Sequence, residues 1–406
     1  MFPWPPWMDG SALNFGTTQL AFLAFFTIVI LLVPRQATFT RFVSLVALST
    51  LTYMLQEAFV QWCGNPHWRG AAAGLLCIQL MSASEMIVVS RVDSASISAS
   101  RGKFKAESIA AQAIKIVALL WNLRRVGTSW QVKNIPASSN SGPASRSRAR
   151  FLLRRLATTL SAYLVMDIMI SGPPPDLVLV SPQKETLFKI GSLSFDDVVF
   201  RTVGTVSFWF STALINLIMT NTVAILSVLA GLSLPADCPP LYGPIGEAYT
   251  IRQFWGTSWH QGLRQGVTGH ADLVADSVLL IPRGTTLSRY TRLFLAFLIS
   301  GLIHHSSDLA MGIPRTEAGS LVFFLLQPLG IMLEDGMQTL TRHIPTSRFL
   351  GRVQRIVGYL WVVMFLVWST PKWFYPQQRL GIGAADLLPF RVLGPLSRQL
   401  QSSWPG

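Results

Sequence analysis

The chain has 406 residues, of which half are hydrophobic and only 13% are charged, and its formal net charge is +14. A soluble domain carries about 25% charged residues, so this composition excludes an ordinary water-soluble enzyme and favours a membrane protein. Nucleic-acid binding is disfavoured, because the basic residues lie between apolar runs and form no known nucleic-acid-binding motif. The three cysteines, Cys63, Cys77 and Cys238, form no CxxC pair, so neither a disulfide framework nor a metal site is expected.

Eight apolar runs reach the length of about 20 residues that a membrane-crossing helix needs. Residues 1–14 precede the first run and lack a basic segment or a clear cleavage site, so we expect a retained anchor, not a signal peptide. The sequence therefore predicts an all-α polytopic membrane protein with about eight transmembrane helices, and one membrane domain over 15–371. The predicted spans are residues 15–34, 42–62, 71–90, 152–171, 205–231, 291–311, 319–335 and 354–371.

The segments between these runs alternate between basic and nearly neutral. Residues 91–150 hold 11 lysines or arginines and two acids, whereas 63–70 holds only one arginine. Basic loops remain in the cytosol, so we expect the loops 91–150 and 233–290 to be cytosolic and both termini to be lumenal. The basic residues of the C-terminal tail, 372–406, fit this topology less well. An integral, multi-pass protein of the endoplasmic reticulum is the expected localisation.

The first large loop contains two different kinds of segment. Apolar residues recur at helical spacing over 105–130, which predicts a helix in the membrane interface with Lys115, Arg124 and Arg125 directed at lipid headgroups. Residues 137–150 are rich in serine and arginine, which is typical of a flexible linker.

The sixth run contains the sequence FLISGLIHHSSD, residues 297–308, with two adjacent histidines. If the helix begins near Arg292, His304 lies about 18 Å along it, inside the hydrocarbon layer. An ionisable residue at that depth is a candidate functional residue. The alternative is a neutral imidazole that joins two helices through a hydrogen bond.

Helical spacing places Ser300, His304 and Asp308 on one face, at i, i+4 and i+8. The Asp308 carboxylate could fix the tautomer of the imidazole, or it could simply mark the hydrated end of the span. His305 points about 100° away from His304 on a helix, so both histidines cannot serve one site equally well. Gly301 allows a second helix or a substrate to approach closely.

A second candidate stretch is RQFWGTSWHQGLRQ, residues 252–265. One interpretation is an aromatic belt at the membrane surface. The other is a site where aromatic and cationic groups bind a charged cofactor, and composition does not separate the two. The residues concerned are Arg252, Trp255, Trp259, His260, Gln261 and Arg264.

Three acids lie within predicted spans, Glu57, Glu85 and Asp167. They could form the proton relay of a secondary transporter together with the histidine. We favour the simpler interpretation that they are paired in contacts between helices or lie near span ends. A non-catalytic membrane scaffold is a third class.

Together the two candidate stretches resemble a known family. The pattern FWG-x-x-WHQ, here FWGTSWHQ (254–261), followed by SGL-x-H, here SGLIH (300–304), is similar to the wax-synthase-like branch of the membrane-bound O-acyltransferases (MBOAT). The segment LLWNLRRVGTSWQVKNIP (119–136) resembles its fungal members. The resemblance covers roughly residues 40–375, and the paired motifs are specific where either alone would be weak.

The resemblance implies an MBOAT-like enzyme that moves an acyl group from acyl-CoA to a hydroxyl group, with His304 as the catalytic histidine. The WHQ segment would lie near the acyl-CoA entrance, with His260 and Asp308 as further candidate catalytic residues. Many fungal relatives are acetyltransferases of terpenoid or meroterpenoid pathways, so acetyl-CoA is the expected co-substrate and a lipophilic hydroxylated molecule the expected partner. A long-chain wax-ester or sterol-ester synthase is the alternative within this family.

One departure concerns Thr257 and Ser258, since relatives often carry basic residues there. Contacts to the phosphates of CoA would then come from Arg252, Arg264 or the basic loop 91–150.

Overall fold

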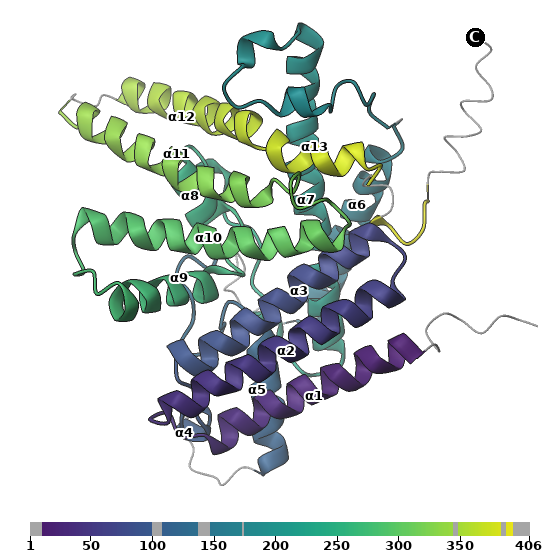
Figure 1. Cartoon of the computed structure of the whole chain (residues 1–406), viewed down its shortest axis with the longest axis vertical. Coiled ribbons are helices and arrows are strands. Elements are labelled where there is room, and N and C mark those ends of the chain that lie inside the picture. Colours follow the sequence, from purple (N-terminus) through teal and green to yellow (C-terminus); the bar gives the residue numbers. More distant parts are fainter. Residues whose placement is uncertain are drawn as a thin grey trace, which may run out of the picture. The chain divides into compact units, whose positions relative to one another are not determined.

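The computed structural model describes residues 10–99, 108–136, 147–172, 174–343, 348–382 and 387–392. All regular elements within these ranges are helices, which confirms the all-α prediction (Figure 1). Residues 1–9, most of the predicted linker at 137–150 and the end of the C-terminal tail lie outside the described residues.

Seven helices of the described ranges are long and apolar enough to cross a membrane. They correspond to seven of the eight predicted spans. The helix over the seventh predicted span is longer than expected, because it runs for 22 residues and continues through Pro328. The seven are α1 (Gly10–Leu32), α2 (Thr38–Trp62), α3 (Pro66–Ser84) with the π-helical turn η2 (Glu85–Val89), α7 (Phe195–Leu229), α10 (Thr286–Ala310), α11 (Ser320–Thr341) and α12 (Arg348–Ser369).

The remaining predicted span, the fourth in chain order (152–171), is also helical, as α6 (Arg148–Met169). With 22 residues α6 is long enough to cross a membrane, but arginines and Asp167 interrupt its apolar sequence, so its composition is not that of the seven apolar helices. Its crossing of the membrane stays a prediction.

The chain consists of two compact units. The first unit contains residues 1–133 and 262–328, and the second contains 134–261 and 329–406. Helix α11 passes from one unit to the other after Pro328. The single domain predicted over 15–371 is therefore built from two units, each formed by two separate stretches of the chain.

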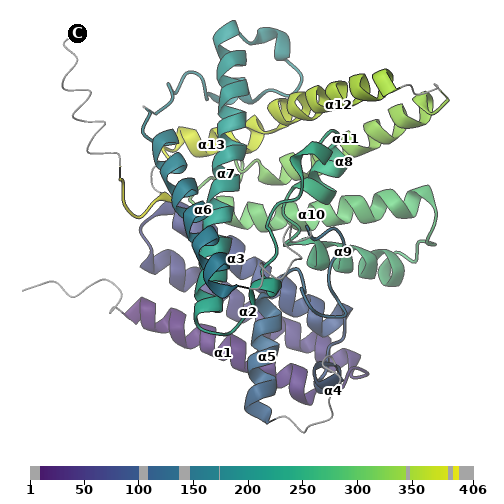
Figure 2. The same ribbon diagram turned by 180° about the vertical axis from the view of Figure 1, so that it is seen from behind.

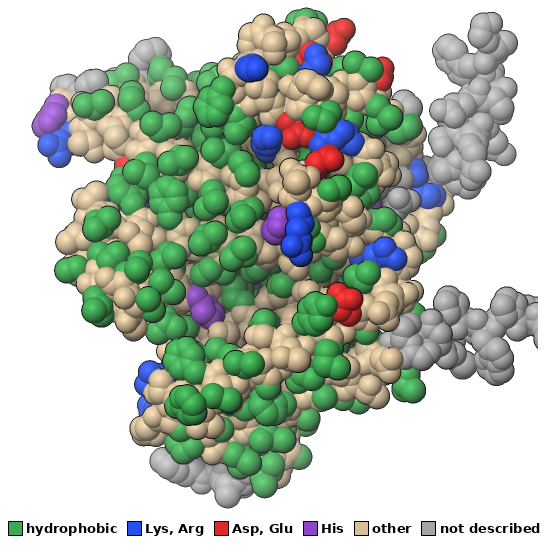
Figure 3. Space-filling view, in the orientation of Figure 1, with side chains coloured by type: hydrophobic (Ala, Val, Ile, Leu, Met, Phe, Trp, Pro, Cys, Tyr) green, Lys and Arg blue, Asp and Glu red, His purple; other side chains and the backbone are tan. Residues whose placement is uncertain are grey.

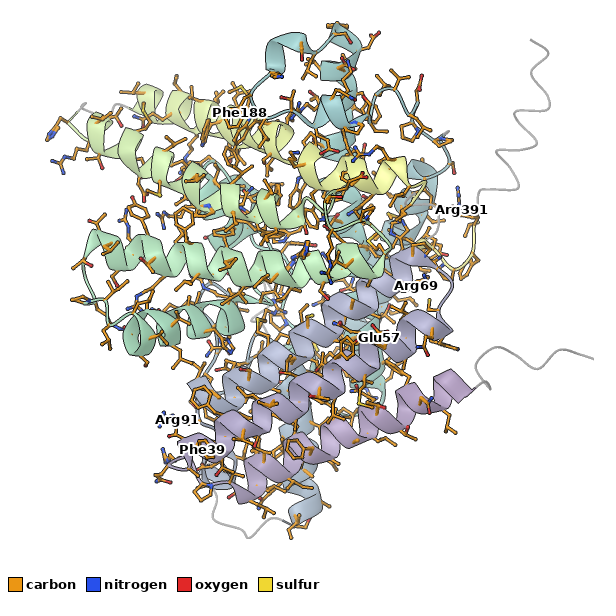
Figure 4. The ribbon with its side chains drawn as sticks, in the orientation of Figure 1. Phe39, Glu57, Arg69, Arg91, Phe188 and Arg391 are labelled. Carbon is orange, nitrogen blue, oxygen red and sulfur yellow. The ribbon has the colours of Figure 1, made fainter. Side chains whose placement is uncertain are left out.

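In the first unit, α1, α2 and α3 follow one another as antiparallel neighbours (Figure 1). Figure 4 shows Phe39 and Arg91 at one end of the α2–α3 pair and Glu57 and Arg69 at the other. Large apolar side chains are exposed on the outward faces of α1 and α2, and Figure 3 shows hydrophobic side chains spread over this surface. Such exposure suits helices that face lipid, where apolar side chains need no burial in protein.

A buried arginine ties the α1–α2 turn to the end of η2. Arg41 is 1% exposed and donates to the carbonyl oxygens of Val33 at 2.7 Å, Pro34 at 3.1 Å, and Ile87 and Val92 at 2.9 Å each. These carbonyls follow helix ends or turns, where the backbone leaves acceptors unsatisfied. The guanidinium therefore supplies hydrogen bonds that the helices cannot make themselves.

Small residues bring α10 against α3. A Cβ atom at Gly70 would lie 2.5 Å from the Cγ of Met311, and one at Gly74 would lie 2.8 Å from the Oγ of Ser307. The spacing of these two glycines is the GxxxG pattern that allows close helix packing in membranes. Gly301 has the same role toward α11, because its Cβ would meet Leu321 at 2.9 Å. Close approach of a second helix at Gly301, as the sequence predicts, is confirmed.

The predicted interface segment 105–130 contains α5 (Ile109–Trp121), which follows the short helix α4 (Ser94–Ala99). The prediction that Arg125 faces lipid headgroups is wrong. Arg125 is 2% exposed, and its guanidinium pairs with the carboxylate of Glu85 at 2.7 Å. An unpaired buried carboxylate is strongly unfavourable, so the pairing explains why this arginine turns inward. It also confirms that Glu85 is paired in a contact between helices.

In the second unit, α6 packs along α7 through Ala162, Met166 and Leu214, and Figure 2 shows the two helices side by side. Asp167 is fully buried and pairs with Arg391, which lies outside the helices. Its place two residues before the end of α6 agrees with the prediction that such an acid lies near a span end. The remaining elements are short: the 3₁₀ turns η4 (Pro182–Glu185), η5 (Ile190–Ser192), η6 (Pro235–Asp237) and η7 (Ile245–Glu247), the helices α8 (Ile251–Gln253), α9 (Arg264–Leu273) and α13 (Pro371–Arg379), and the π-helical turns η8 (Phe254–Ser258) and η9 (Val274–Val278). Of these, α9 and η9 belong to the first unit.

Candidate functional site

The predicted base, His304, lies two turns before the end of α10. Its Nδ1 atom is 2.8 Å from the carbonyl oxygen of Ser300, one turn earlier on the same helix. A carbonyl only accepts, so the Nδ1 atom of the neutral imidazole carries the proton and donates it. The lone pair then lies on Nε2. The ring stacks on Phe324 of α11 at a centroid distance of 4.4 Å, which fixes its plane.

Asp308 is one turn further along α10 and is 1% exposed. Its Oδ2 atom accepts a hydrogen bond of 3.3 Å from the backbone N–H of Ser320, the first residue of α11. First-turn N–H groups have no partner within their own helix, so this carboxylate helps to fix the start of α11. Asp308 is thus buried, whereas the alternative interpretation places it at a hydrated span end. We infer a positioning role for it.

His305 differs from His304 in its surroundings. Its Nδ1 atom is buried and has no hydrogen-bond partner among the described residues. Adjacent residues of a helix point about 100° apart, which separates this ring from the face that carries Ser300 and His304.

Arg264 begins α9 in the same unit as His304. Burial lowers the pKa of its guanidinium, because the charged form loses hydration. The next residue, Gln265, donates to Oε1 of Glu85 at 3.1 Å. Glu85 also pairs with Arg125 and accepts from Ser90. The first turn of α9, which contains Arg264, is therefore hydrogen-bonded to the buried carboxylate of Glu85 through Gln265.

In the second unit, the FWGTSWHQ stretch folds into the π-helical turn η8, where the N–H of Trp259 donates to the carbonyl of Phe254 at 2.7 Å. Gln261 is 3% exposed, and its Nε2 atom donates to the carbonyls of Trp255 at 3.0 Å and Trp259 at 2.7 Å. π-Helical turns are rare and frequently occur at functional sites. The side chain of Gln261 therefore stabilises the turn, because it donates hydrogen bonds to two backbone carbonyl groups of this stretch.

A second segment holds η8 from outside. Asn134 adopts a left-handed backbone conformation, with a φ of 62°, and its Nδ2 atom donates to the carbonyl of Gly256 at 3.0 Å. Ser258 is buried and donates to the carbonyl of Pro244 at 2.9 Å. A Cβ at Gly243 would lie 2.1 Å from the carbonyl oxygen of Thr257, so only glycine fits there.

The aromatic rings of the motif converge on Trp209 of α7. Its ring lies 5.8 Å from Phe254, 5.7 Å from Trp255 and 5.1 Å from Trp259, all nearly edge to face. Its Nε1 donates to Oγ1 of Thr370 at 3.0 Å. Edge-to-face pairs are worth about 0.5 to 1.5 kcal/mol each beyond their burial. The tryptophans of the motif thus form a packed cluster that supports the turn.

His260 lies at the edge of this cluster, 5.4 Å from the ring of Trp259 and 6.4 Å from that of Tyr242. The hydroxyl of Tyr242 donates to the carbonyl of Ala213 at 3.1 Å. Burial raises the pKa of Tyr242, because the phenolate would lose its hydration. Tyr242 therefore stays protonated and keeps this hydrogen bond across the physiological pH range.

Glu334 of α11 fixes the entry into the turn. Its carboxylate is 7% exposed and accepts from the backbone N–H groups of Ile251 at 2.5 Å and Arg252 at 3.2 Å, and from Nε1 of Trp361 at 2.9 Å. The neighbouring Asp335 pairs with the guanidinium of Arg252 at 2.6 Å. Arg252 is thus paired with a carboxylate of the same unit.

The predicted site residues are divided between the two units. Trp209 and Glu334 were missed, although an aromatic residue and an acid within apolar runs were visible signals. In the described part of the chain, no group of three or more histidine, cysteine, aspartate or glutamate side chains could hold a metal ion. The first unit contains Arg264, His304 and Asp308, and the second contains Arg252, Trp255, Trp259, His260 and Gln261.

Comparison with known proteins supports the paired motifs. The family model described as "Membrane bound O-acyl transferase family" matches residues 238–326. This range includes both FWGTSWHQ and SGLIH, so the match rests on the same part of the chain as the motifs. No solved structure matches the chain.

Several curated relatives are named acetyltransferases. Acetyltransferase ataH of Aspergillus terreus is 35% identical, over 70% of this chain and 95% of that protein. Acetyltransferase pyr8 of Aspergillus fumigatus is 31% identical, over 80% of this chain and 79% of that protein. Acetyltransferase spyB of Aspergillus fumigatus is 31% identical over 79% of this chain, but the match spans only 58% of that protein.

Proposed function

Because the chain belongs to the membrane-bound O-acyltransferase family, we propose that it transfers an acetyl group from acetyl-CoA to a hydroxyl group of a lipophilic terpenoid or meroterpenoid. The names of the relatives support acetyl as the group transferred. The observation that carries the proposal is the state of His304, whose Nδ1–H is directed at its own helix and whose lone pair is on Nε2.

The reaction needs a base, because an alcohol attacks a thioester slowly unless its proton is removed as the new bond forms. Nε2 of His304 accepts that proton while the alcohol oxygen bonds to the thioester carbonyl carbon. The C–S bond then breaks, and the imidazolium returns the proton to the CoA thiolate. General-base catalysis contributes about 10² to 10⁴-fold, or about 3 to 5.5 kcal/mol. Positioning of both substrates and exclusion of water supply further acceleration.

The substrates suit a membrane enzyme. A lipophilic acceptor reaches the protein through the bilayer, while acetyl-CoA is polar and comes from the cytosol. Arg264 is the arginine that we assign to a CoA phosphate, because it lies in the first turn of α9, which the hydrogen bond from Gln265 to Glu85 holds in place. A helix N-terminus adds favourable potential for an anion. The proposed location is the endoplasmic reticulum membrane.

Release of free CoA by microsomes carrying the chain tests this function. Acetyl-CoA and palmitoyl-CoA are supplied separately, each with a pool of lipophilic alcohols that includes terpenoids. We expect acceptor-dependent release from acetyl-CoA, with loss of about 10² to 10⁴-fold in His304→Ala. His304→Gln controls for folding, and His305→Ala is the matched neighbour. An unchanged rate in His304→Ala at normal expression contradicts the assignment of the base.

The same assay separates the alternatives. Preference for palmitoyl-CoA would indicate a wax-ester or sterol-ester synthase. A proton-coupled transporter would release no CoA and would accumulate substrate in vesicles. Asp308→Asn separates positioning from catalysis. We expect this variant to keep most of kcat, because the tautomer of His304 is set by the hydrogen bond that Nδ1–H donates to the carbonyl of Ser300, and not by Asp308.

A further inference from the structure

Residues 174–194 of the second unit form a loop without long helices that precedes α7. The loop is held by charged groups that face inward. Glu185 is 6% exposed and pairs with Lys372 at 3.3 Å and with Arg379 of α13. Lys184 pairs with Asp197, which is 4% exposed. These charges are neutralised within the protein.

The carbonyl groups of the loop are satisfied in the same way. Arg201 donates to the carbonyls of Lys184 at 3.4 Å and Thr186 at 3.1 Å. Nε1 of Trp368 donates to the carbonyl of Leu187 at 2.6 Å. Side chains from α7 and α12 thus hold the loop in one conformation, so what it presents outward is fixed.

What the loop presents outward is apolar. Phe188 is 88% exposed, Leu177 63% and Val178 66%, and Phe195 at the start of α7 is 81% exposed. Figure 4 labels Phe188. Scattered exposed apolar side chains are ordinary, but four within one short segment that is tied down by buried ion pairs indicate an apolar partner.

This surface is continuous with a stripe along α7. Val199, Val203, Val206 and Phe210 are all exposed and follow Phe195 at helical spacing. Since α7 is long and apolar enough to cross a membrane, lipid is the partner of that stripe. Phe195 begins the stripe and directly follows the loop in the chain, so we take lipid to be the partner of the loop as well.

We propose that Leu177, Val178, Phe188 and Phe195 form a lipid-contact surface that inserts into the bilayer beside α7. The partner is the acyl-chain and glycerol region of uncharged lipid. The exposed charges beside this surface are Asp176 and Lys189 of the loop and Asp196 of α7. Two are negative and one is positive, so anionic headgroups are not required for the contact.

Spin labelling of the full chain in nanodiscs of phosphatidylcholine tests the surface. Single cysteines replace Phe188 or Phe195 in a background where the three native cysteines are alanine. Gln183, exposed on the same loop, is the matched control position. The accessibility of each label to oxygen, which concentrates in lipid, is compared with its accessibility to a water-soluble nickel chelate.

We expect labels at 188 and 195 to show an oxygen-to-nickel ratio several-fold above that at 183, unchanged when phosphatidylserine is added. A water-like ratio at 188 overturns the proposal, because it places the side chain in solvent. Shielding of the 188 label from both reagents also overturns it, since that result indicates a protein partner. Because Phe188 is exposed, its replacement leaves the packed part of the unit unchanged.

Discussion

Replacing Glu334 with glutamine tests whether one carboxylate holds the FWGTSWHQ turn in place. The carboxylate accepts two bonds at Oε1, from Ile251 and Trp361, and one at Oε2, from Arg252. Glutamine has one acceptor oxygen. With that oxygen at the Oε1 position, the amide nitrogen faces the N–H of Arg252, and two donors oppose each other.

The expected cost follows from these bonds. A hydrogen bond to a charged group contributes about 1.5 to 3 kcal/mol, whereas a neutral one contributes about 0.5 to 1.5 kcal/mol. Glu334→Gln loses the bond from Arg252 and converts two charged bonds to neutral ones, so mid-range values give an expected loss of about 5 kcal/mol. For a unit of this size, 1 kcal/mol shifts the midpoint by about 2 to 4 °C, so the expected decrease is about 10 to 20 °C.

Thermal unfolding in detergent, followed by tryptophan fluorescence, measures this decrease, since Trp361 and the turn tryptophans are in the affected unit. Asp335→Asn is the matched control. It removes the exposed pair with Arg252, and exposed pairs are worth about 0 to 1 kcal/mol. If Glu334→Gln lowers the thermal midpoint by no more than Asp335→Asn does, the reasoning is refuted, because the carboxylate of Glu334 then contributes no more than that of Asp335.

Three further changes test other contacts. Gly74→Leu should cost about 3 kcal/mol and reduce folded yield by size-exclusion chromatography, because even a Cβ there lies 2.8 Å from Oγ of Ser307; normal yield contradicts close α3–α10 packing. Trp209→Leu should lower the free energy of unfolding by about 2 to 4 kcal/mol, whereas replacement of the exposed neighbour, Phe210→Leu, should change it little. Equal shifts of the thermal midpoint in the two variants would contradict the packing of the aromatic cluster around Trp209. Hydrogen bonds from two arginines lower the pKa of Asp276. Its carboxylate therefore stabilises the fold above the unfolded pKa, near pH 4, and this stabilisation is lost as the pH falls. Between about pH 6 and pH 3 the thermal midpoint should drop less in Asp276→Asn than in the unchanged protein, and parallel profiles would contradict this.

Sequence periodicity predicted the elements well where a long apolar run decides the structure alone. It failed where a distant partner decides. Arg125 was assigned to the lipid headgroups from its helical spacing, but Glu85, 40 positions earlier, pairs with it in the interior. The division of the chain into two units could not be predicted either, because each unit joins stretches that are far apart in sequence.

The site shows the same limit. The two motifs both lie in the range that the family model matches, residues 238–326. The supports of the motifs were missed because they are single residues inside apolar runs. Trp209 was read only as part of the span 205–231, and Glu334 only as the end of 319–335. Trp209 matters because the rings of the motif pack against it, and Glu334 because it accepts hydrogen bonds from the backbone N–H groups before the turn. Neither contact is visible in a local sequence pattern.

Sequence spacing alone did not identify the group that fixes the tautomer of His304. Spacing pointed to Asp308, one turn later, as the group that could fix the tautomer. On a helix, however, the carbonyl one turn earlier is within reach of Nδ1. His304 uses that of Ser300, and His270 of α9 uses that of Gly266 at 2.7 Å. In both, Nδ1 carries the proton and the lone pair is on Nε2. Nε2 of His270 lies 2.8 Å from the hydroxyl of Ser84. A helical histidine can therefore present a basic Nε2 without a carboxylate, and a carboxylate at i+4 remains available to cap the next helix.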